Sequence, residues 1–254
     1  MSPTPNELTE NLARVRERIE RAAKRSGRRP EEITLVAVSK THSARKIQDL
    51  YGAGVRHFGE NRVQERESKL AHLAGLEATW HMIGHLQKNK AGRAAALFDS
   101  VDSLDDITLA DKLNRARETF AAPSAGEASD SPQSISSNPV DPMRVLIEVK
   151  LDPGPAKTGL KDQDVPRLVE ALLLLPHLAL RGLMGVPPYS DNPEDARPHF
   201  RRLRETRDAL RSRLGRETLS VLSMGMSHDF EIAIEEGATE VRVGTALFGE
   251  RESA

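Results

Sequence analysis

The chain has 254 residues, and its 37 lysines and arginines nearly balance its 38 aspartates and glutamates, which gives a formal net charge of -1. This balance gives no general electrostatic reason to bind nucleic acid or an anionic membrane, and we expect neither as a partner. The absence of cysteine excludes disulfides, thiol nucleophiles and cysteine metal sites, and it fits a reducing, cytoplasmic setting.

The N-terminal residues 2–10 are polar and lack the apolar centre of a secretion signal. The most apolar stretch, residues 171–180, is much shorter than the roughly 20 residues that span a bilayer. We therefore expect no membrane segment. The length suits a single domain over residues 1–254, because closed α/β barrels of about this size are common.

The first element is an amphipathic helix, followed by a change of period. Leu8, Leu12, Val15 and Ile19 recur at helical spacing and predict a helix from about residue 7 to residue 25. Residues 33–39 form a short apolar run rich in β-branched side chains, which is typical of a parallel strand buried on both faces. Similar or weaker runs occur at residues 57–60, 80–85, 100–103, 145–149, 180–186, 219–224 and 240–244.

Helix-period segments lie between these runs, at residues 44–51, 109–116, 200–214 and 230–237. Eight strands alternating with helices in a chain of this length predict an α/β protein with a closed (β/α)8 barrel, preceded by the extra N-terminal helix. An open doubly wound sheet is the alternative. No G-x-G-x-x-G follows the first strand, which weakens a dinucleotide-binding interpretation.

One segment interrupts the alternation. Residues 120–142 are dominated by serine, alanine and proline and have almost no large apolar side chain, so they predict a disordered surface loop. The alternative is a regulatory or partner-binding segment, but no recognition motif is present in it.

The active site of such a barrel lies at the carboxyl ends of its strands, and a phosphate commonly binds at the loops after strands seven and eight. Lys40 ends the first strand. Taken alone, a lysine at this position is more simply explained by a side chain that extends its charge to water. Next to a phosphate site, its amine becomes a candidate for forming a Schiff base.

Two turns are candidates for the phosphate site. Residues 223–227 form a turn with glycine and hydroxyl side chains just before a helix, and Gly244 and Thr245 form the matching turn after the eighth strand. The alternative for Ser227 is that it only caps the following helix.

Arg242 stands inside an apolar strand, where a buried guanidinium without a partner is costly. It either forms a salt bridge across the barrel, to Glu148 or Glu60, or donates to the ring of a ligand. An aldehyde cofactor with a phosphate and a ring nitrogen would use Lys40, the two turns and Arg242 together, and pyridoxal 5'-phosphate is such a molecule.

Six stretches carry a family resemblance: V38-S-K40, G59-E-N-R-V-Q-E65, H81-M-I-G-H-L-Q-K-N-K90, R181-G-L-M184, L222-S-M-G-M-S227 and V241-R-V-G-T-A-L-F-G249. Together they resemble the pyridoxal phosphate homeostasis proteins, relatives of the N-terminal barrel of alanine racemase. The resemblance covers nearly the whole chain.

The resemblance implies a fold-type III barrel in which Lys40 holds pyridoxal 5'-phosphate as a Schiff base. It also implies the remaining contacts: the phosphate would be bound by Ser223, Met224, Gly225, Ser227, Gly244 and Thr245, the pyridine nitrogen would face Arg242, and Asn61 and His85 would lie near the cofactor. It implies neither a catalytic residue nor a metal ligand.

We expect a monomeric carrier that stores pyridoxal 5'-phosphate or delivers it, with apo-enzymes that use this cofactor as partners. The racemases have a second domain that supplies a catalytic tyrosine, and here only Tyr51 and Tyr189 are present. An arginine at the ring nitrogen also makes the cofactor a weaker electron sink than a carboxylate would. The alternatives are a racemase or lyase acting from the barrel alone, and a Schiff-base aldolase without a cofactor.

Overall fold

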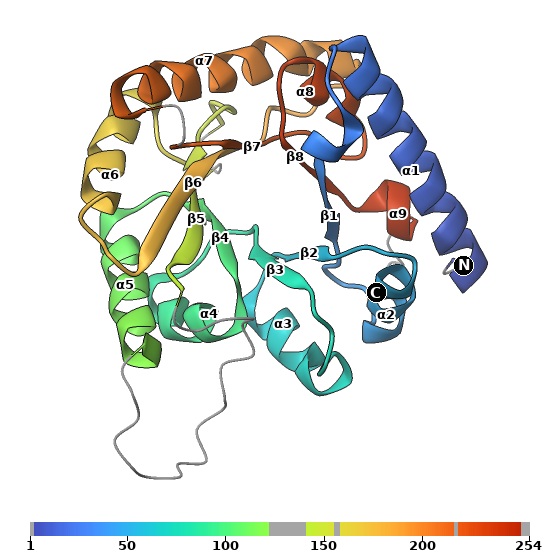
Figure 1. Cartoon of the computed structure of the whole chain (residues 1–254), viewed down its shortest axis with the longest axis horizontal. Helices are drawn as coiled ribbons and strands as arrows, with labels where there is room; N and C mark the ends of the chain where they lie inside the picture. The colour runs from blue at the N-terminus through green and yellow to red at the C-terminus, as the bar shows by residue number, and fades with distance from the viewer. Residues whose placement is uncertain (1–2, 122–140, 155–157, 216–217, 250–254) are drawn as a thin grey trace.

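The computed structural model describes residues 3–121, 141–154, 158–215 and 218–249. Eight parallel strands close into a barrel in chain order, with β8 hydrogen-bonded back to β1 (Figure 1). This confirms the (β/α)8 prediction and excludes the open sheet. The strands are β1 (Thr34–Val38), β2 (His57–Glu60), β3 (Thr79–Met82), β4 (Ser100–Leu104), β5 (Met143–Val149), β6 (Leu178–Gly185), β7 (Val221–Ser223) and β8 (Glu240–Val243).

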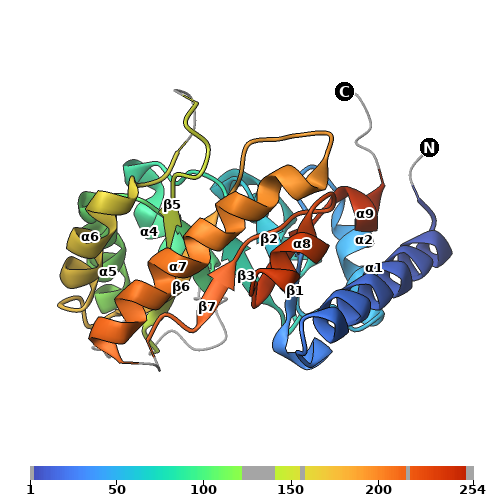
Figure 2. The same ribbon diagram turned by 90° about the horizontal axis from the view of Figure 1, so that it is seen from above.

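Helices surround the barrel on its outside, as the view from above shows (Figure 2). They are α1 (Pro5–Arg25), α2 (Ala44–Gly52), α3 (Val63–Lys69), α4 (Ala91–Leu97), α5 (Ile107–Ala121), α6 (Val165–Leu172), α7 (Arg197–Leu214), α8 (Phe230–Glu235) and α9 (Thr245–Phe248). Short 3-10 turns occupy Pro30–Glu32, Leu70–His72, Lys88–Lys90, Asp162–Asp164 and Pro193–Ala196. Over the described ranges, no helix is both long and apolar enough to cross a bilayer.

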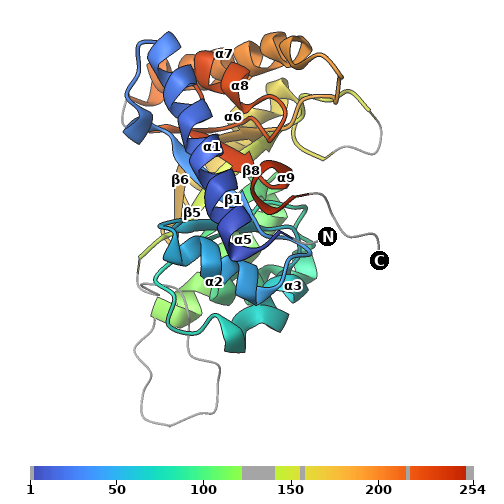
Figure 3. The same cartoon turned by 90° about the vertical axis from the view of Figure 1, so that its right-hand side faces the viewer.

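Helix α1 is the predicted extra N-terminal helix. It starts with a capping box, in which Thr4 accepts from the Glu7 amide and the Glu7 carboxylate accepts from the Thr4 amide. Its apolar face, which includes Leu8 and Leu12, packs on α2, α8 and α9, and it crosses in front of β1 and β8 (Figure 3). The helix therefore covers the seam at which the first and last strands close the barrel.

The strands have two buried sides with different chemistry. On the outside, residues such as Ala37, Phe58 and Val243 join the hydrophobic core beneath the helices. On the inside, the register aligns Val36 of β1 with Arg242 of β8, and residues in register on parallel strands point the same way. Further inward-facing residues follow from the same register: His57, Gly59, His81, Ser100, Glu148, Met184, Ser223 and Glu240. The barrel interior is thus largely polar, whereas barrel interiors usually hold branched apolar side chains.

The predicted loop at residues 120–142 is corrected at its start. Helix α5 continues through Phe120 and Ala121 because the periodic face of that helix, which includes Ala116 and Phe120, packs against the core. Residues 122–140 lie outside the described residues, so the prediction of disorder stays a prediction.

Candidate functional site

Lys40 lies at the carboxyl-terminal rim of the barrel, two residues after the last residue of β1. Continuing the alternation of β1 places it on the same side as Val36 and Val38, which face the interior, and its side chain is half-buried. Thr41, the next residue, has a φ of 65°, a left-handed conformation that is uncommon for a threonine. The chain thus turns sharply directly after the lysine.

A buried ion pair fixes the backbone just before Lys40. The Lys69 amine, at the end of α3, donates to the Ser39 carbonyl at 2.9 Å and to Glu60 Oε1 at 2.7 Å. The Ser39 hydroxyl donates to the same Glu60 oxygen at 2.7 Å. Burial raises the pKa of Glu60 to about 7, although the charge of Lys69 opposes this shift. Strands β1 and β2 and helix α3 are therefore joined directly beneath the lysine.

The turn that follows Lys40 also contacts helix α9, which lies after β8. The ring of His42 stacks on Phe248 of α9, with ring centroids 4.4 Å apart. Helix α9 begins at Thr245, one of the two predicted phosphate turns. The turn that contains Lys40 and the turn that contains Gly244 thus belong to one packed unit.

Ser227 joins the turns after β7 and β8. Its hydroxyl oxygen accepts from the Gly244 amide at 3.3 Å and from the Ala246 amide at 3.2 Å. The N-cap of α8 is Asp229, whose carboxylate accepts from the Met226 amide at 2.7 Å. The alternative that Ser227 caps α8 is therefore wrong.

The structure places two predicted phosphate ligands elsewhere. The Ser223 hydroxyl is fully buried inside the barrel and accepts from Arg242 Nη1 at 2.7 Å, so its side chain supports Arg242. The Met224 side chain is fully buried in the outer core, and its amide donates to the Glu240 carbonyl at 3.1 Å. Both follow from their position at the end of a buried strand, and neither side chain reaches the turn.

Gly225 makes the turn after β7 possible. Its φ is 91°, and a Cβ added there would lie 2.6 Å from the Ala233 Cβ and 2.8 Å from the Phe230 Cα. Any other residue would therefore push α8 away from the rim.

Arg242 is 4% exposed and is held inside the barrel by its own hydrogen bonds. Besides its bond to Ser223, it donates from Nη2 to the Gly185 carbonyl at 3.1 Å. Its predicted salt-bridge partners have other partners: Glu60 pairs with Lys69, and Glu148 accepts from Thr158 at 2.8 Å. Burial lowers the pKa of Arg242, and the negative charges of Glu240 and Asp102 oppose this.

Asn61 and His85 lie on the opposite part of the rim, after β2 and β3. Both line a hollow of about 730 Å³, together with Glu65. The Glu65 carboxylate accepts from the Thr41 amide at 3.3 Å, so the hollow lies next to the Lys40 turn. The residues that line it do not include Lys40 or Ser227.

Comparison with known proteins identifies the family. Residues 11–252 match the family model described as alanine racemase, N-terminal domain. The pyridoxal phosphate homeostasis protein of Aquifex aeolicus is 43% identical over 243 residues, which are 96% of this chain and 98% of that protein. That of Pseudomonas aeruginosa is 41% identical over 96% of each chain. The chain belongs to the pyridoxal phosphate homeostasis protein family.

A solved structure agrees with this assignment. PipY of Synechococcus elongatus, described with pyridoxal phosphate bound, superposes with a TM-score of 0.78 at 34% identity and covers 95% of this chain and 100% of its own. This pyridoxal phosphate homeostasis family member thus shares its fold with PipY along nearly its whole length.

The two tyrosines of this family member both contact other side chains. Tyr51, in α2, is half-buried with the Arg56 guanidinium 4.1 Å above its ring. Tyr189 is 79% exposed, and its hydroxyl donates to Asp191 at 3.2 Å.

Three residues near the site were not predicted as part of it. The Ala246 amide was missed because backbone donors leave no signal in side-chain patterns. Lys69 was missed because its contact with Ser39 spans 30 residues. Glu148 was considered only as an ion-pair partner, although an acidic residue inside an apolar strand is the same signal that drew attention to Arg242. Burial raises the pKa of Glu148.

Proposed function

We propose that this chain binds pyridoxal 5'-phosphate as a Schiff base on Lys40 and serves as a carrier that stores or delivers it. The observation that supports this most is the joining of three features at one rim: a lysine at the end of β1, a bridged pair of turns after β7 and β8, and an arginine fixed inside the barrel. The names of the relatives and the PipY complex agree with it.

The residues present fit the cofactor. The Ser227 hydroxyl and the amides of Gly244 and Ala246, which donate to it in this structure, form a compact polar group, and these amides would turn from Ser227 to a phosphate on binding, with Thr245 between them in the chain. Gly225 lets α8 pack closely against this turn. When bound, the cofactor would supply an electrophilic aldehyde, and Lys40 would be the amine that holds it covalently.

Arg242 would orient the ring and favour storage over turnover. Its guanidinium keeps its proton under ordinary conditions, so it holds a neutral ring nitrogen by a hydrogen bond and does not transfer a proton to it. The Tyr51 ring contacts Arg56 and the Tyr189 hydroxyl donates to Asp191, and we assign neither of them as a second proton donor. Both points support a carrier, which we propose to be a cytoplasmic monomer with apo-enzymes as recipients.

The absorption spectrum before and after borohydride tests the proposal. We expect the protein loaded with pyridoxal 5'-phosphate to absorb visible light, to lose this absorbance on reduction, and to retain the label on a peptide containing Lys40. Lys40→Ala should abolish the reducible absorbance and leave the melting temperature of the unloaded protein close to that of the wild type. Lys150→Ala is the matched control, since Lys150 also lies just past the end of a strand, β5.

Two results would contradict the proposal. A reducible adduct that persists in Lys40→Ala would move the attachment to another lysine, such as Lys150 or Lys157, the latter outside the described residues. Steady racemisation or cleavage of an amino acid by the loaded wild type would replace the carrier with an enzyme.

A further inference from the structure

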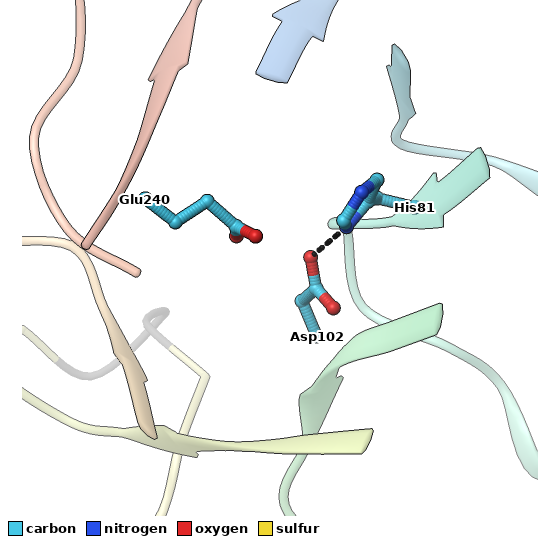
Figure 4. A group of neighbouring side chains, drawn as sticks. All are labelled: His81, Asp102 and Glu240. Carbon is cyan, nitrogen blue, oxygen red and sulfur yellow. Dashed lines mark hydrogen bonds and ion pairs between the residues drawn. The ribbon is translucent and has the colours of Figure 1, made fainter. Parts of the chain in front are cut away.

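A second polar cluster lies deeper in the barrel, away from the Lys40 rim. It consists of His81 on β3, Asp102 on β4 and Glu240 at the start of β8 (Figure 4). All three side chains are buried, and one ligand atom from each lies within 4.8 Å of the other two. The three residues come from strands far apart in the chain and meet because the closed barrel brings them together.

One oxygen of this cluster lacks a partner. Glu240 is 2% exposed, and its Oε1 accepts no hydrogen bond from the part of the chain that the structure describes. Its carboxylate points across the interior toward His81 and Asp102 (Figure 4). A buried carboxylate oxygen without a donor or cation is costly, and Asp102 adds a second carboxylate nearby.

The other members of the cluster are already oriented by hydrogen bonds. His81 Nδ1 lies 2.8 Å from Asp102 Oδ2, and His81 Nε2 lies 3.1 Å from His57 Nδ1. Asp102 also accepts from the Ser100 hydroxyl. Because an ionised carboxylate only accepts, Nδ1–H donates to Asp102 and Nε2 accepts from His57 Nδ1–H, so an ion that binds Nδ1 has to replace this proton.

The neighbouring cations do not satisfy Glu240 directly. Arg242 donates to Ser223 and to the Gly185 carbonyl. Arg144 faces the interior from β5 and is half-buried. Burial, followed by the charge of Asp102, raises the pKa of Glu240, and His57 is kept neutral because burial lowers its pKa to about 4.

We propose that His81, Asp102 and Glu240 bind a divalent metal ion of the Zn²⁺ and Co²⁺ class. One imidazole nitrogen with two carboxylate oxygens is a donor set that such borderline ions accept, whereas Mg²⁺ and Ca²⁺ prefer oxygen alone. Ligand bonds of about 2.0–2.2 Å place neighbouring donors roughly 3.3 Å apart, so the most distant donors have to approach by up to about 1.5 Å, while His81 and Asp102, now 2.8 Å apart, have to separate slightly.

One of the three proposed ligands, Glu240, lies beside a hollow at the end of the barrel opposite Lys40. Glu240 and Arg144 line a hollow of about 360 Å³ with Thr34 and Ser220. Glu240 is the first residue of β8 and pairs in register with Thr34, the first residue of β1, which places the hollow at the amino-terminal ends of the strands. The metal site and the proposed cofactor site therefore open at opposite ends and can be tested separately.

The test uses the full chain without pyridoxal 5'-phosphate or an affinity tag, freed of metal with a chelator and titrated with Co²⁺ and Zn²⁺ over a long incubation. We expect one ion per chain and the visible absorption of low-coordinate Co²⁺. We also expect more protons to be released per bound ion at lower pH, because the ligands must lose their protons to bind. Glu240→Gln keeps the shape of the side chain and should weaken binding at least 10-fold.

Glu148→Gln, which changes another buried carboxylate of the interior, is the matched control and should bind the ions as the wild type does. Because Glu240→Gln can lower stability, the proton release of the wild type gives a reading that needs no variant. The proposal is overturned if the wild type takes up no ion at millimolar Co²⁺ or Zn²⁺, or if Glu240→Gln and the wild type bind with the same affinity.

Discussion

At Ser227 a single hydroxyl oxygen accepts two backbone amides from the neighbouring turn. This bridge matters for the proposed function, because the same amides would have to turn from Ser227 to a phosphate oxygen. The residue thus both shapes the phosphate turns and lies within reach of the ligand that they would bind. The sequence suggested two roles for Ser227, a helix cap or a phosphate ligand, and only its contacts with the turn after β8 distinguish them.

We expect Ser227→Ala to weaken the binding of pyridoxal 5'-phosphate much more than the binding of unphosphorylated pyridoxal. A lost hydrogen bond to a charged phosphate costs about 1.5–3 kcal/mol, or roughly 10- to 150-fold in affinity. Spectral titration with both ligands measures the difference, and Thr245→Ala should change it in the same direction. Ser212→Ala, on the exposed side of α7, is the control. Equal weakening for both ligands would assign Ser227 a structural role only.

Among the elements, β1, β2 and α3 form a unit held by the Glu60–Lys69 pair. The pKa of Glu60 rises to about 7 on folding from an ordinary value of 4.5. Between these values the folded chain keeps a proton that the unfolded chain has lost, so this contribution to stability is present below pH 4.5 and is lost as the pH rises through 7.

Glu60→Gln should therefore flatten the pH dependence of the unfolding free energy. Urea unfolding of the wild type at about pH 5 and pH 8 should show a larger loss of stability than the variant does over the same interval. Glu205→Gln, an exposed change on α7, should behave like the wild type. If the unfolding free energies of the wild type and Glu60→Gln depend on pH to the same extent, the prediction is wrong, and Lys69 keeps Glu60 ionised over the whole interval.

The turn between β7 and α8 gives a second prediction at this scale. Gly225→Ala and Gly75→Ala both place a Cβ at positive φ, 91° and 85°, but only Gly225 has neighbours within 4 Å. Backbone strain alone costs about 1–2 kcal/mol in each, and overpacking adds about 1–3 kcal/mol at Gly225. Thermal or urea unfolding measures both. Equal destabilisation would mean that α8 moves without resistance.

The elements were predictable to different extents. Strands such as β1 and β8 were found because parallel strands buried on both faces read as apolar runs, and the polar residues inside these runs, Arg242 above all, became the site signals. Helices α4 and α6 were not predicted, since α4 is mostly alanine and α6 lies in a nearly continuous apolar stretch, and neither pattern has a clear helical period. The roles of Ser223 and Lys69 could not be predicted, because they depend on which strands meet after closure.

For the molecule as a whole, closure of the barrel depends on the seam between β1 and β8, which α1 covers. The Asn11 side chain donates to the Leu247 carbonyl of α9 at 2.8 Å, and so the first and last described helices are also joined by a hydrogen bond. The seam is thus stabilised from outside by residues at both ends of the described chain.

We expect Leu12→Ala to lower the free energy of unfolding by about 2–5 kcal/mol. Leu12 is 1% exposed on the buried face of α1, and truncating its side chain leaves a cavity. Leu174→Ala is the control for the same change of side chain at 82% exposure, and it should have almost no effect. Denaturant unfolding measures both. A similar loss of unfolding free energy in the two variants would show that α1 does not contribute to the closure of the barrel.

The stacking of His42 on Phe248 has a further consequence for a carrier. It ties the turn with Lys40 to the helix that follows Gly244, so the proposed covalent attachment and the proposed phosphate contacts would lie on one packed unit. When either attachment breaks, the other keeps the ligand at a high effective concentration, and rebinding is faster than escape. Handing the ligand to another protein then requires both attachments to open together. Contact that separates the His42 and Phe248 rings is one way for a recipient to trigger this.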